Sequence, residues 1–315
     1  MGLVWDVSFL LCGLLLLFLG GEGLVRGATS IATQFGLSKL IVGLVIVGFG
    51  TSAPELLVSI QAALAGAPDI AIGNVVGSNI ANVLLIVGAA AIIAPLANTD
   101  PSIRRDLVVM VASSFLIWGL FLLGAIERFA GLGLFAALCV YLGISYLVEA
   151  KRKNSAPAEL PGTDTPMATG PAALFVVAGI AMLVLGARFM VDGATGIARD
   201  LGISEAVIGL TIVAIGTSLP ELATAIVASR KNEAEVVLAN VVGSNIFNIL
   251  CILGVTAMIS PIAVAGRFAS VDGPIMIVVA VAAAAYLFWL RSIGRGVGVG
   301  LVDVYAAYIA IQNAV

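Results

Sequence analysis

Long apolar stretches dominate the sequence, and short polar connections separate them. Examples of these apolar blocks are Phe9–Leu19, Leu107–Leu123, Leu134–Val148 and Ile275–Leu290. Such blocks approach the roughly 20 residues that a helix needs to cross the hydrocarbon core of a bilayer. The pattern therefore predicts an all-α polytopic membrane protein with ten transmembrane helices.

The predicted spans fall into two groups of five. The first five cover about 7–34, 39–65, 69–94, 106–123 and 129–149, and the second five about 171–198, 205–229, 234–260, 272–290 and 297–313. Residues 150–170 between the groups are rich in Pro, Ser, Thr, Gly and charge, so they have too few apolar side chains to pack. We therefore predict one five-helix unit at 1–149, a cytoplasmic linker at 150–170 and a second five-helix unit at 171–315.

The two units are copies of each other. GLVIVGFGTSAPE at 43–55 recurs as GLTIVAIGTSLPE at 209–221, and NVVGSNIAN at 74–82 recurs as NVVGSNIFN at 240–248, both 166 positions later. Because each copy has an odd number of spans, the second must cross the membrane in the opposite sense to the first. Inverted repeats with interrupted helices are typical of secondary transporters, whose substrate site lies near the bilayer midplane.

Composition and charge support a membrane location and set the orientation. The chain is 61% hydrophobic and 10% charged, against about 45–50% and 25% in soluble domains, and no basic footprint for nucleic acid is present. With the N-terminus outside, the cytoplasmic loops hold ten basic residues and the outer loops three. The ten are Lys39, Arg104, Arg105, Lys151, Arg152, Lys153, Arg230, Lys231, Arg291 and Arg295, and the three are Arg128, Arg199 and Arg267. The positive-inside rule thus predicts that both termini lie outside, and we expect the chain in the cell inner (plasma) membrane.

Two glutamates inside predicted spans are the main candidates for function. Glu55 and Glu221 occupy equivalent positions in the two copies, and each directly follows a proline. A proline within a helix removes one backbone hydrogen bond and frees the carbonyl four residues earlier, here at Gly50 and Gly216, so we expect both helices to kink or unwind. An ionisable residue at the bilayer centre costs about 2.5–3.5 kcal/mol on insertion scales, which makes it a functional candidate.

Hydroxyl and amide side chains accompany these glutamates. Thr51 and Ser52 precede Glu55 by four and three residues and therefore reach the same helix face. Polar residues also recur at i, i+4 and i+8 in the third and eighth spans: Asn74, Ser78 and Asn82, and Asn240, Ser244 and Asn248. Carboxylate, amide, hydroxyl and free carbonyl oxygens together suit a hard cation such as Ca²⁺ or Na⁺. Interhelical hydrogen bonding, worth about 0.6 kcal/mol per contact, is the alternative, but it does not explain two Pro-Glu pairs.

Charges also occur four residues apart in the first helix of each copy. Glu22 pairs with Arg26 in the first copy, and Arg188 with Asp192 in the second, with reversed polarity. A helix-surface ion pair shielded from lipid is one interpretation. The other is a gate, or a contact of a sliding helix, near the ion entrance.

The GTSxPE segments at 50–55 and 216–221, with the GNxxGSNI-type segments at 73–80 and 239–246, resemble the Ca²⁺/cation antiporter superfamily, specifically its prokaryotic sodium/calcium exchangers. The resemblance implies ten helices, with helices 2, 3, 7 and 8 as the core and helices 1 and 6 sliding past it. It also implies these ion ligands, the first and seventh through their carbonyls: Gly48, Thr51, Ser52, Glu55, Ser78, Asn82, Ala214, Thr217, Ser218, Glu221, Ser244 and Asn248. Several exchangers have aspartate where this chain has Asn248, so this site would carry two negative charges rather than three.

We therefore expect a secondary active antiporter that exchanges Ca²⁺ for Na⁺ by alternating access, as a monomer in the bilayer and without a cofactor. H⁺ in place of Na⁺ is the nearest alternative. A channel or uniporter would show flux without a counter-ion, and the inverted repeat argues against it. A membrane enzyme using the two glutamates as acid and base would need a nucleophile that the sequence does not single out.

Overall fold

Helices build almost all of the part of the chain that the computed structural model describes, namely residues 3–35, 42–97, 101–153, 167–201, 214–290 and 292–314. Seven of the described helices are long and apolar enough to cross a membrane. The protein is therefore a helical membrane protein. The predicted spans 39–65 and 205–229 lie partly outside the described residues. Lys39 and most of the predicted linker also lie outside them.

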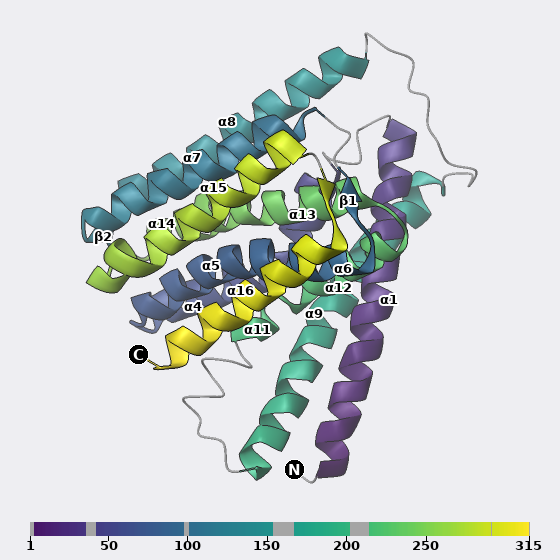
Figure 1. Ribbon diagram of the computed structural model, residues 1–315, viewed down its shortest axis with the longest axis horizontal. Coiled ribbons are helices and arrows are strands. Elements are labelled where there is room, and N and C mark those ends of the chain that lie inside the picture. The colour runs from purple at the N-terminus through teal and green to yellow at the C-terminus, as the bar shows by residue number, and fades with distance from the viewer. Residues whose placement is uncertain are drawn as a thin grey trace.

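Two long helices, α1 (Leu3–Phe35) and α9 (Thr169–Asp200), lie side by side and cross the remaining helices at a steep angle (Figure 1). Glycines allow this pair to approach closely, since a Cβ added at Gly13 would lie 2.7 Å from the carbonyl oxygen of Gly186. Their outward faces are apolar and exposed, as Leu11 at 64% and Leu185 at 47% illustrate. These faces are suited to contact with lipid.

The centre of the bundle is formed by two helical rods of similar construction. The first runs through α5 (Pro68–Ala81), η2 (Asn82–Ile86) and α6 (Val87–Ile93). The second runs through α13 (Ala234–Phe247), η4 (Asn248–Leu253) and α14 (Gly254–Ile259), and its apolar segment is fully buried by the other helices. Each rod changes from α to the wider π geometry at an asparagine, Asn82 or Asn248. Such π turns inside α-helices are frequently found at functional sites.

The predicted helix interruptions at the prolines are confirmed. In the first copy, η1 (Gly43–Gly48) and α3 (Phe49–Thr51) end at Ser52, and α4 (Ala53–Leu64) follows. In the second copy, α11 (Ala214–Gly216) and α12 (Leu219–Arg230) flank a turn at residues 217–218. Ser52 has ψ near 6° and Ser218 near 4°, which departs from helical geometry. Each proline then lies in the first turn of the new helix, where its missing N–H is not needed.

Four further helices flank the centre: α7 (Ile103–Leu122), α8 (Arg128–Lys153), α15 (Gly273–Leu290, preceded by η5, Phe268–Asp272) and α16 (Arg295–Ala314). In Figure 1, α7, α8 and α15 lie together on the side of the central rods away from α9, whereas α16 packs against α6 and η2. Two short antiparallel ladders join their connections at opposite ends of α7. β1 (Leu96–Ala97) pairs with β4 (Ser292–Ile293), and β2 (Ala125–Ile126) pairs with β3 (Ile262–Ala263). Each ladder links the two halves of the sequence.

Candidate ion-binding site

The structure brings Glu55 and Glu221 into one buried site. Each glutamate lies in the first turn of the helix that begins after the proline break, and each is only 1% exposed. The Ser52 hydroxyl donates to Glu221 Oε1 at 3.1 Å, while Ser218 lies beside Glu55. Each carboxylate therefore contacts a serine hydroxyl from the other half of the chain. Their position at helix N-termini favours negative charge, because the helix dipole is positive there.

The hydroxyls of the two breaks also contact the central rods. Thr51 Oγ1, which donates to the Val47 carbonyl at 3.0 Å, lies 3.4 Å from Asn240 Oδ1, and the equivalent Thr217 Oγ1 lies 3.3 Å from Asn74 Oδ1. These two contacts are related by the 166-residue offset of the repeat. They tie each broken helix to the rod of the other half of the chain.

Two further hydroxyl groups, those of Ser78 and Ser244, contact residues of the two breaks. Ser218 Oγ and Ser78 Oγ are 3.3 Å apart, and Ser244 Oγ donates to the carbonyl oxygen of Gly48 at 3.4 Å. That carbonyl oxygen is therefore oriented toward the same region. Ala214 begins α11, three residues before Thr217, and only its backbone placement is described.

The ligand asparagines predicted from the sequence are held by two asparagines that were not predicted. Asn82 Nδ2 donates to Asn245 Oδ1 at 2.9 Å, and Asn248 Nδ2 donates to Asn79 Oδ1 at 2.9 Å. Asn79 and Asn245 are the asparagines of the repeated GSNI segments. Their recurrence at equivalent positions was the signal in the sequence that could have identified them.

Four buried side-chain oxygens at this site lack a hydrogen-bond partner within the described part of the chain. They are Glu55 Oε2, Glu221 Oε2, Asn82 Oδ1 and Asn248 Oδ1, two pairs related by the repeat. A buried acceptor without a partner costs about 1–3 kcal/mol, so four together call for a ligand. A cation would satisfy all four. The Nδ2 of Asn240 also lacks a partner within the described part of the chain.

The chemistry of this donor set restricts the ion. Among the described residues, no group of three or more His, Cys, Asp or Glu side chains could hold a metal. The site therefore combines two carboxylates with neutral amide, hydroxyl and carbonyl oxygens. Calcium takes about six to eight oxygen ligands in flexible geometry, and oxygen ligands of this kind suit hard cations.

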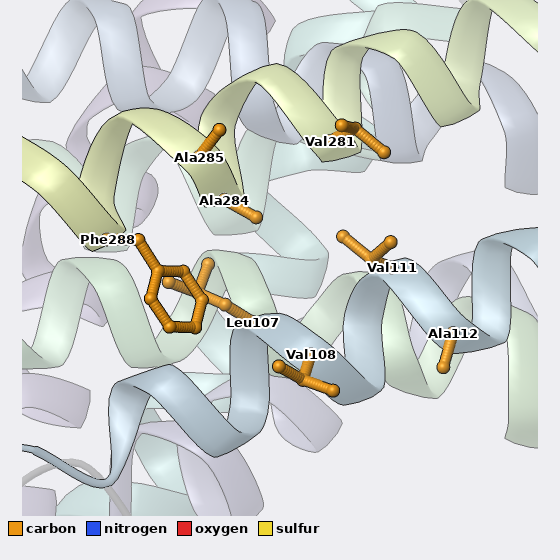
Figure 2. Close-up of a pocket in the computed structure, with 8 residues that line it drawn as sticks. All are labelled: Leu107, Val108, Val111, Ala112, Val281, Ala284, Ala285 and Phe288. Atoms are coloured by element: carbon orange, nitrogen blue, oxygen red, sulfur yellow. The ribbon is translucent and has the colours of Figure 1, made fainter.

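A separate cavity of about 340 Å³ lies between α7 and α15, away from this site (Figure 2). Its lining includes Leu107, Val111, Ala284 and Phe288, and all of the side chains that line it are apolar. It offers no oxygen that could bind a cation. The candidate ion site is therefore the group of polar side chains around the two glutamates.

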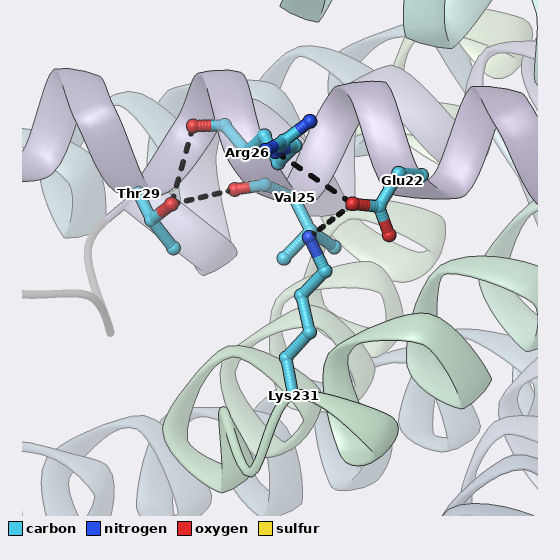
Figure 3. Close-up of polar contacts among 5 residues, drawn as sticks. All are labelled: Glu22, Val25, Arg26, Thr29 and Lys231. Carbon is cyan, nitrogen blue, oxygen red and sulfur yellow. Dashed lines mark hydrogen bonds and ion pairs between the residues drawn. The ribbon is translucent and has the colours of Figure 1, made fainter. Parts of the chain in front are cut away.

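The predicted pair of Glu22 and Arg26 is present, and a third residue joins it. Glu22 Oε1 lies 3.7 Å from Arg26 Nε and 2.6 Å from Lys231 Nζ (Figure 3). Lys231 follows the last residue of α12, so this contact ties α1 to the central helices. Arg188 and Asp192 are both described, and they form no ion pair with each other in the structure. The two halves therefore differ here.

Known proteins show the same sequence pattern and fold. Residues 5–147 and 171–313 match the family described as sodium/calcium exchanger protein. The chain is 37% identical to the inner membrane protein YrbG of Escherichia coli, over 96% of this chain and 95% of that one. It is 34% identical to the sodium/calcium exchanger MaX1 of Methanosarcina acetivorans, over 96% and 97% of the two chains.

Solved structures agree with this assignment. The sodium-calcium exchanger NCX_Mj, soaked with Na⁺ and without Ca²⁺, superposes with a TM-score of 0.86 at 30% identity, and the match covers 98% of this chain and 99% of that one. Exchangers of this kind are transporters that couple the movement of Ca²⁺ to that of another cation. By sequence and by fold, the chain belongs to the sodium/calcium exchanger family.

Proposed function

We propose that the protein exports Ca²⁺ across the inner membrane in exchange for Na⁺, by alternating access to the site around Glu55 and Glu221. We further propose ten spans, arranged as two inverted units at 1–149 and 171–315 with both termini outside. The four partnerless oxygens of Glu55, Glu221, Asn82 and Asn248 carry this proposal. They come from both halves of the chain, and all four are buried.

The proposed ion ligands are the twelve residues named from the resemblance. The carboxylates of Glu55 and Glu221 would supply the charge, and the amides of Asn82 and Asn248 would supply neutral oxygens. The other eight would contribute hydroxyl or backbone oxygens: Gly48, Thr51, Ser52, Ser78, Ala214, Thr217, Ser218 and Ser244. The contacts of Ser52 with Glu221 and of Ser244 with the Gly48 carbonyl support this grouping.

Charge balance explains why such a site would exchange ions rather than conduct them. Two carboxylates in a low-dielectric site are too costly to leave uncompensated, so the empty site would not reorient. One Ca²⁺ or two monovalent ions would neutralise them, and either load would permit the change of access. With asparagine at 248, no third carboxylate is available for an additional Na⁺.

Related proteins support the choice of ions and membrane. NCX_Mj structures were obtained with Na⁺ and with Ca²⁺ or Sr²⁺, and MaX1 is named a sodium/calcium exchanger. YrbG is named an inner membrane protein. None of these names decides between Na⁺ and H⁺ for this chain, so H⁺ stays the alternative counter-ion.

Purified protein in proteoliposomes separates the two counter-ions. Vesicles loaded with Na⁺ and diluted into Na⁺-free medium are expected to take up ⁴⁵Ca²⁺, and collapsing a pH gradient should leave this uptake unchanged. Uptake driven by a pH gradient in Na⁺-free buffer would show that the counter-ion is H⁺ rather than Na⁺. Uptake that needs no counter-ion gradient would instead indicate a channel. Because one Ca²⁺ would exchange for two Na⁺, uptake should also be insensitive to an imposed membrane potential.

A further inference from the structure

We propose that Asn79 and Asn245, named here the crossed amide pair, are positioning residues that turn the oxygens of Asn82 and Asn248 toward the ion. This inference rests on the proposed function, because it concerns the orientation of two proposed ligands. It assigns a role to two residues that are not themselves ligands. Both are 2% exposed and lie where α5 and α13 meet at the centre of the bundle.

Each member of the pair donates to the backbone of the other. Asn79 Nδ2 donates to the Asn245 carbonyl oxygen at 3.3 Å, and Asn245 Nδ2 donates to the Asn79 carbonyl oxygen at 3.2 Å. The second hydrogen of each amide faces a thioether, that of Met276 for Asn79 and of Met110 for Asn245, with N to S distances of 3.7 Å. Both hydrogens of each NH₂ group are thus directed at acceptors.

These backbone contacts determine which way each amide faces. A carbonyl oxygen only accepts hydrogen bonds, so the group of Asn79 that faces the Asn245 carbonyl must be the NH₂. The oxygen of Asn79 then faces Asn248, which must present its own NH₂ in return. Consequently Asn248 Oδ1 faces away from Asn79, and it is one of the partnerless oxygens of the site. The same steps lead from Asn245 to Asn82 Oδ1.

The arrangement crosses between the two halves of the chain. Asn82 of the first half is oriented by Asn245 of the second, and Asn248 of the second half by Asn79 of the first. Without its partner, the amide of a ligand asparagine could turn over and present NH₂ to the cation, which cannot ligate. An alanine at 79 would remove the acceptor for Asn248 only, because the Asn79 carbonyl that Asn245 uses belongs to the backbone.

Double substitutions test this crossed dependence by calcium titration of the purified protein. Asn82→Ala and Asn245→Ala are each expected to weaken Ca²⁺ binding by about 10-fold or more, as removing an outer contact of a metal ligand does. The double variant should bind no more weakly than Asn82→Ala alone, because Asn245 acts through Asn82. The matched control combines Asn245→Ala with Asn248→Ala, where the two losses should multiply. Multiplied losses in the first pair would overturn the proposal.

A carboxylate in place of a ligand amide provides the second test. The two oxygens of an aspartate are equivalent, so Asn248→Asp needs no orientation, and its oxygens would face the Asn79 oxygen unfavourably. Asn79→Ala should therefore lower Ca²⁺ affinity in the wild-type background and leave it unchanged or raised in the Asn248→Asp background. An equal loss in both backgrounds would mean that Asn79 only supports packing, and the positioning role would be wrong.

The two proposals fail in different ways. If Asn82→Ala and Asn248→Ala both leave Ca²⁺ binding unchanged, the proposed ligand set is wrong, and the crossed amide pair has nothing to orient. If both weaken binding but show no crossed dependence, the ion site stands and only the positioning role is refuted.

Discussion

Two pairs of helices in this protein pack in opposite ways. The central pair, the rods built from α5 with η2 and from α13 with η4, meets through side-chain amides, with four hydrogen bonds between the two halves of the chain. The outer pair, α1 and α9, comes into close backbone contact at glycines spaced seven residues apart, and the Phe9 and Phe189 rings also pack between the two helices. We name these glycines the glycine seam: Gly13, Gly20 and Gly27 in α1, and Gly179, Gly186 and Gly193 in α9.

The glycine seam brings the two helices into direct backbone contact. A Cβ added at Gly20 would lie 2.8 Å from the Gly179 carbonyl oxygen, and one added at Gly186 would lie 2.9 Å from that of Gly13. Cβ atoms essentially never approach a carbonyl oxygen so closely, so only glycine fits. Small residues at helix interfaces in membranes permit this close packing, which is driven by van der Waals contact.

The difference between the pairs matches two different tasks. Hydrogen bonds are directional, so the central pair specifies where ligand oxygens point. The contact between α1 and α9 along the glycine seam is the most extensive between any two described helices, so we infer that α1 and α9 move together as one unit. The Glu22–Lys231 ion pair is a polar contact between this unit and the central helices. Alternating access would then displace the outer pair while the central pair keeps the site intact.

Removing one charge from the central site should have the largest effect. Glu55→Gln and Glu221→Gln preserve shape, but each leaves one carboxylate to balance a divalent ion. Charge-assisted contacts are about twice as strong as neutral ones, so we expect Ca²⁺ affinity to fall by at least about 100-fold in calorimetric titration. Glu22→Gln, on α1 and outside the site, is the control and should bind normally. Retained binding and exchange in both site variants would refute the assignment.

A side chain placed in the glycine seam should separate movement from binding. Gly20→Val puts a branched side chain where a single Cβ already lies within 2.8 Å of backbone, and overpacking of this kind costs about 1–3 kcal/mol. We expect exchange in proteoliposomes to fall by about 10-fold, because α1 and α9 can no longer pack as a unit. Calcium affinity in detergent should stay within about two-fold, since the central pair is untouched.

The control for the seam is Gly143→Val in α8, where an added Cβ meets nothing within 4 Å. This variant should exchange ions as the wild type does. Equal rates in the two variants would show that close packing of α1 against α9 is unnecessary for transport. A loss of calcium binding in Gly20→Val would show instead that the two helix pairs are not independent.

Much of the central site could be predicted from the sequence because its signals are local. The Pro-Glu pairs predict the breaks, which lie at Ser52 and Ser218, and apolar length places most spans within a few residues, as for α8 (Arg128–Lys153) against the predicted 129–149. The π turns that begin at Asn82 and Asn248 could not be predicted, since no residue preference distinguishes them from α-helix. Nor could the crossed amide pair, because its partners are set by the contact of α5 with α13.

Two buried aspartates also have partners that could not be predicted from the repeated sequence. Asp106 and Asp272 are related by the same 166-residue offset and are 1% and 5% exposed. Asp106 accepts from Tyr141 at 2.9 Å and pairs with the adjacent Arg105, whereas Asp272 accepts from Gln312 at 2.8 Å and pairs with Arg267. The positions repeat but the partners differ. Tertiary packing, rather than the repeated sequence, selects them.

Removing the ion pair between Glu22 of α1 and Lys231, which follows α12, should have the smallest effect on transport. Lys231 and Glu22 are about 30% exposed, at 29% and 32%, and partly exposed pairs contribute about 0.2–1 kcal/mol. Since this contact joins the moving unit to the centre, Lys231→Gln should change the exchange rate by at most about five-fold and leave Ca²⁺ affinity unchanged.

Arg26→Ala should change the rate less, because Arg26 is 60% exposed and lies 3.7 Å from Glu22. Exchanging the charges, with Glu22→Lys and Lys231→Glu together, should restore the wild-type rate if the contact acts through its pairing. Wild-type kinetics in Lys231→Gln and in Arg26→Ala would leave this cluster without a part in gating and reduce it to a surface ion pair.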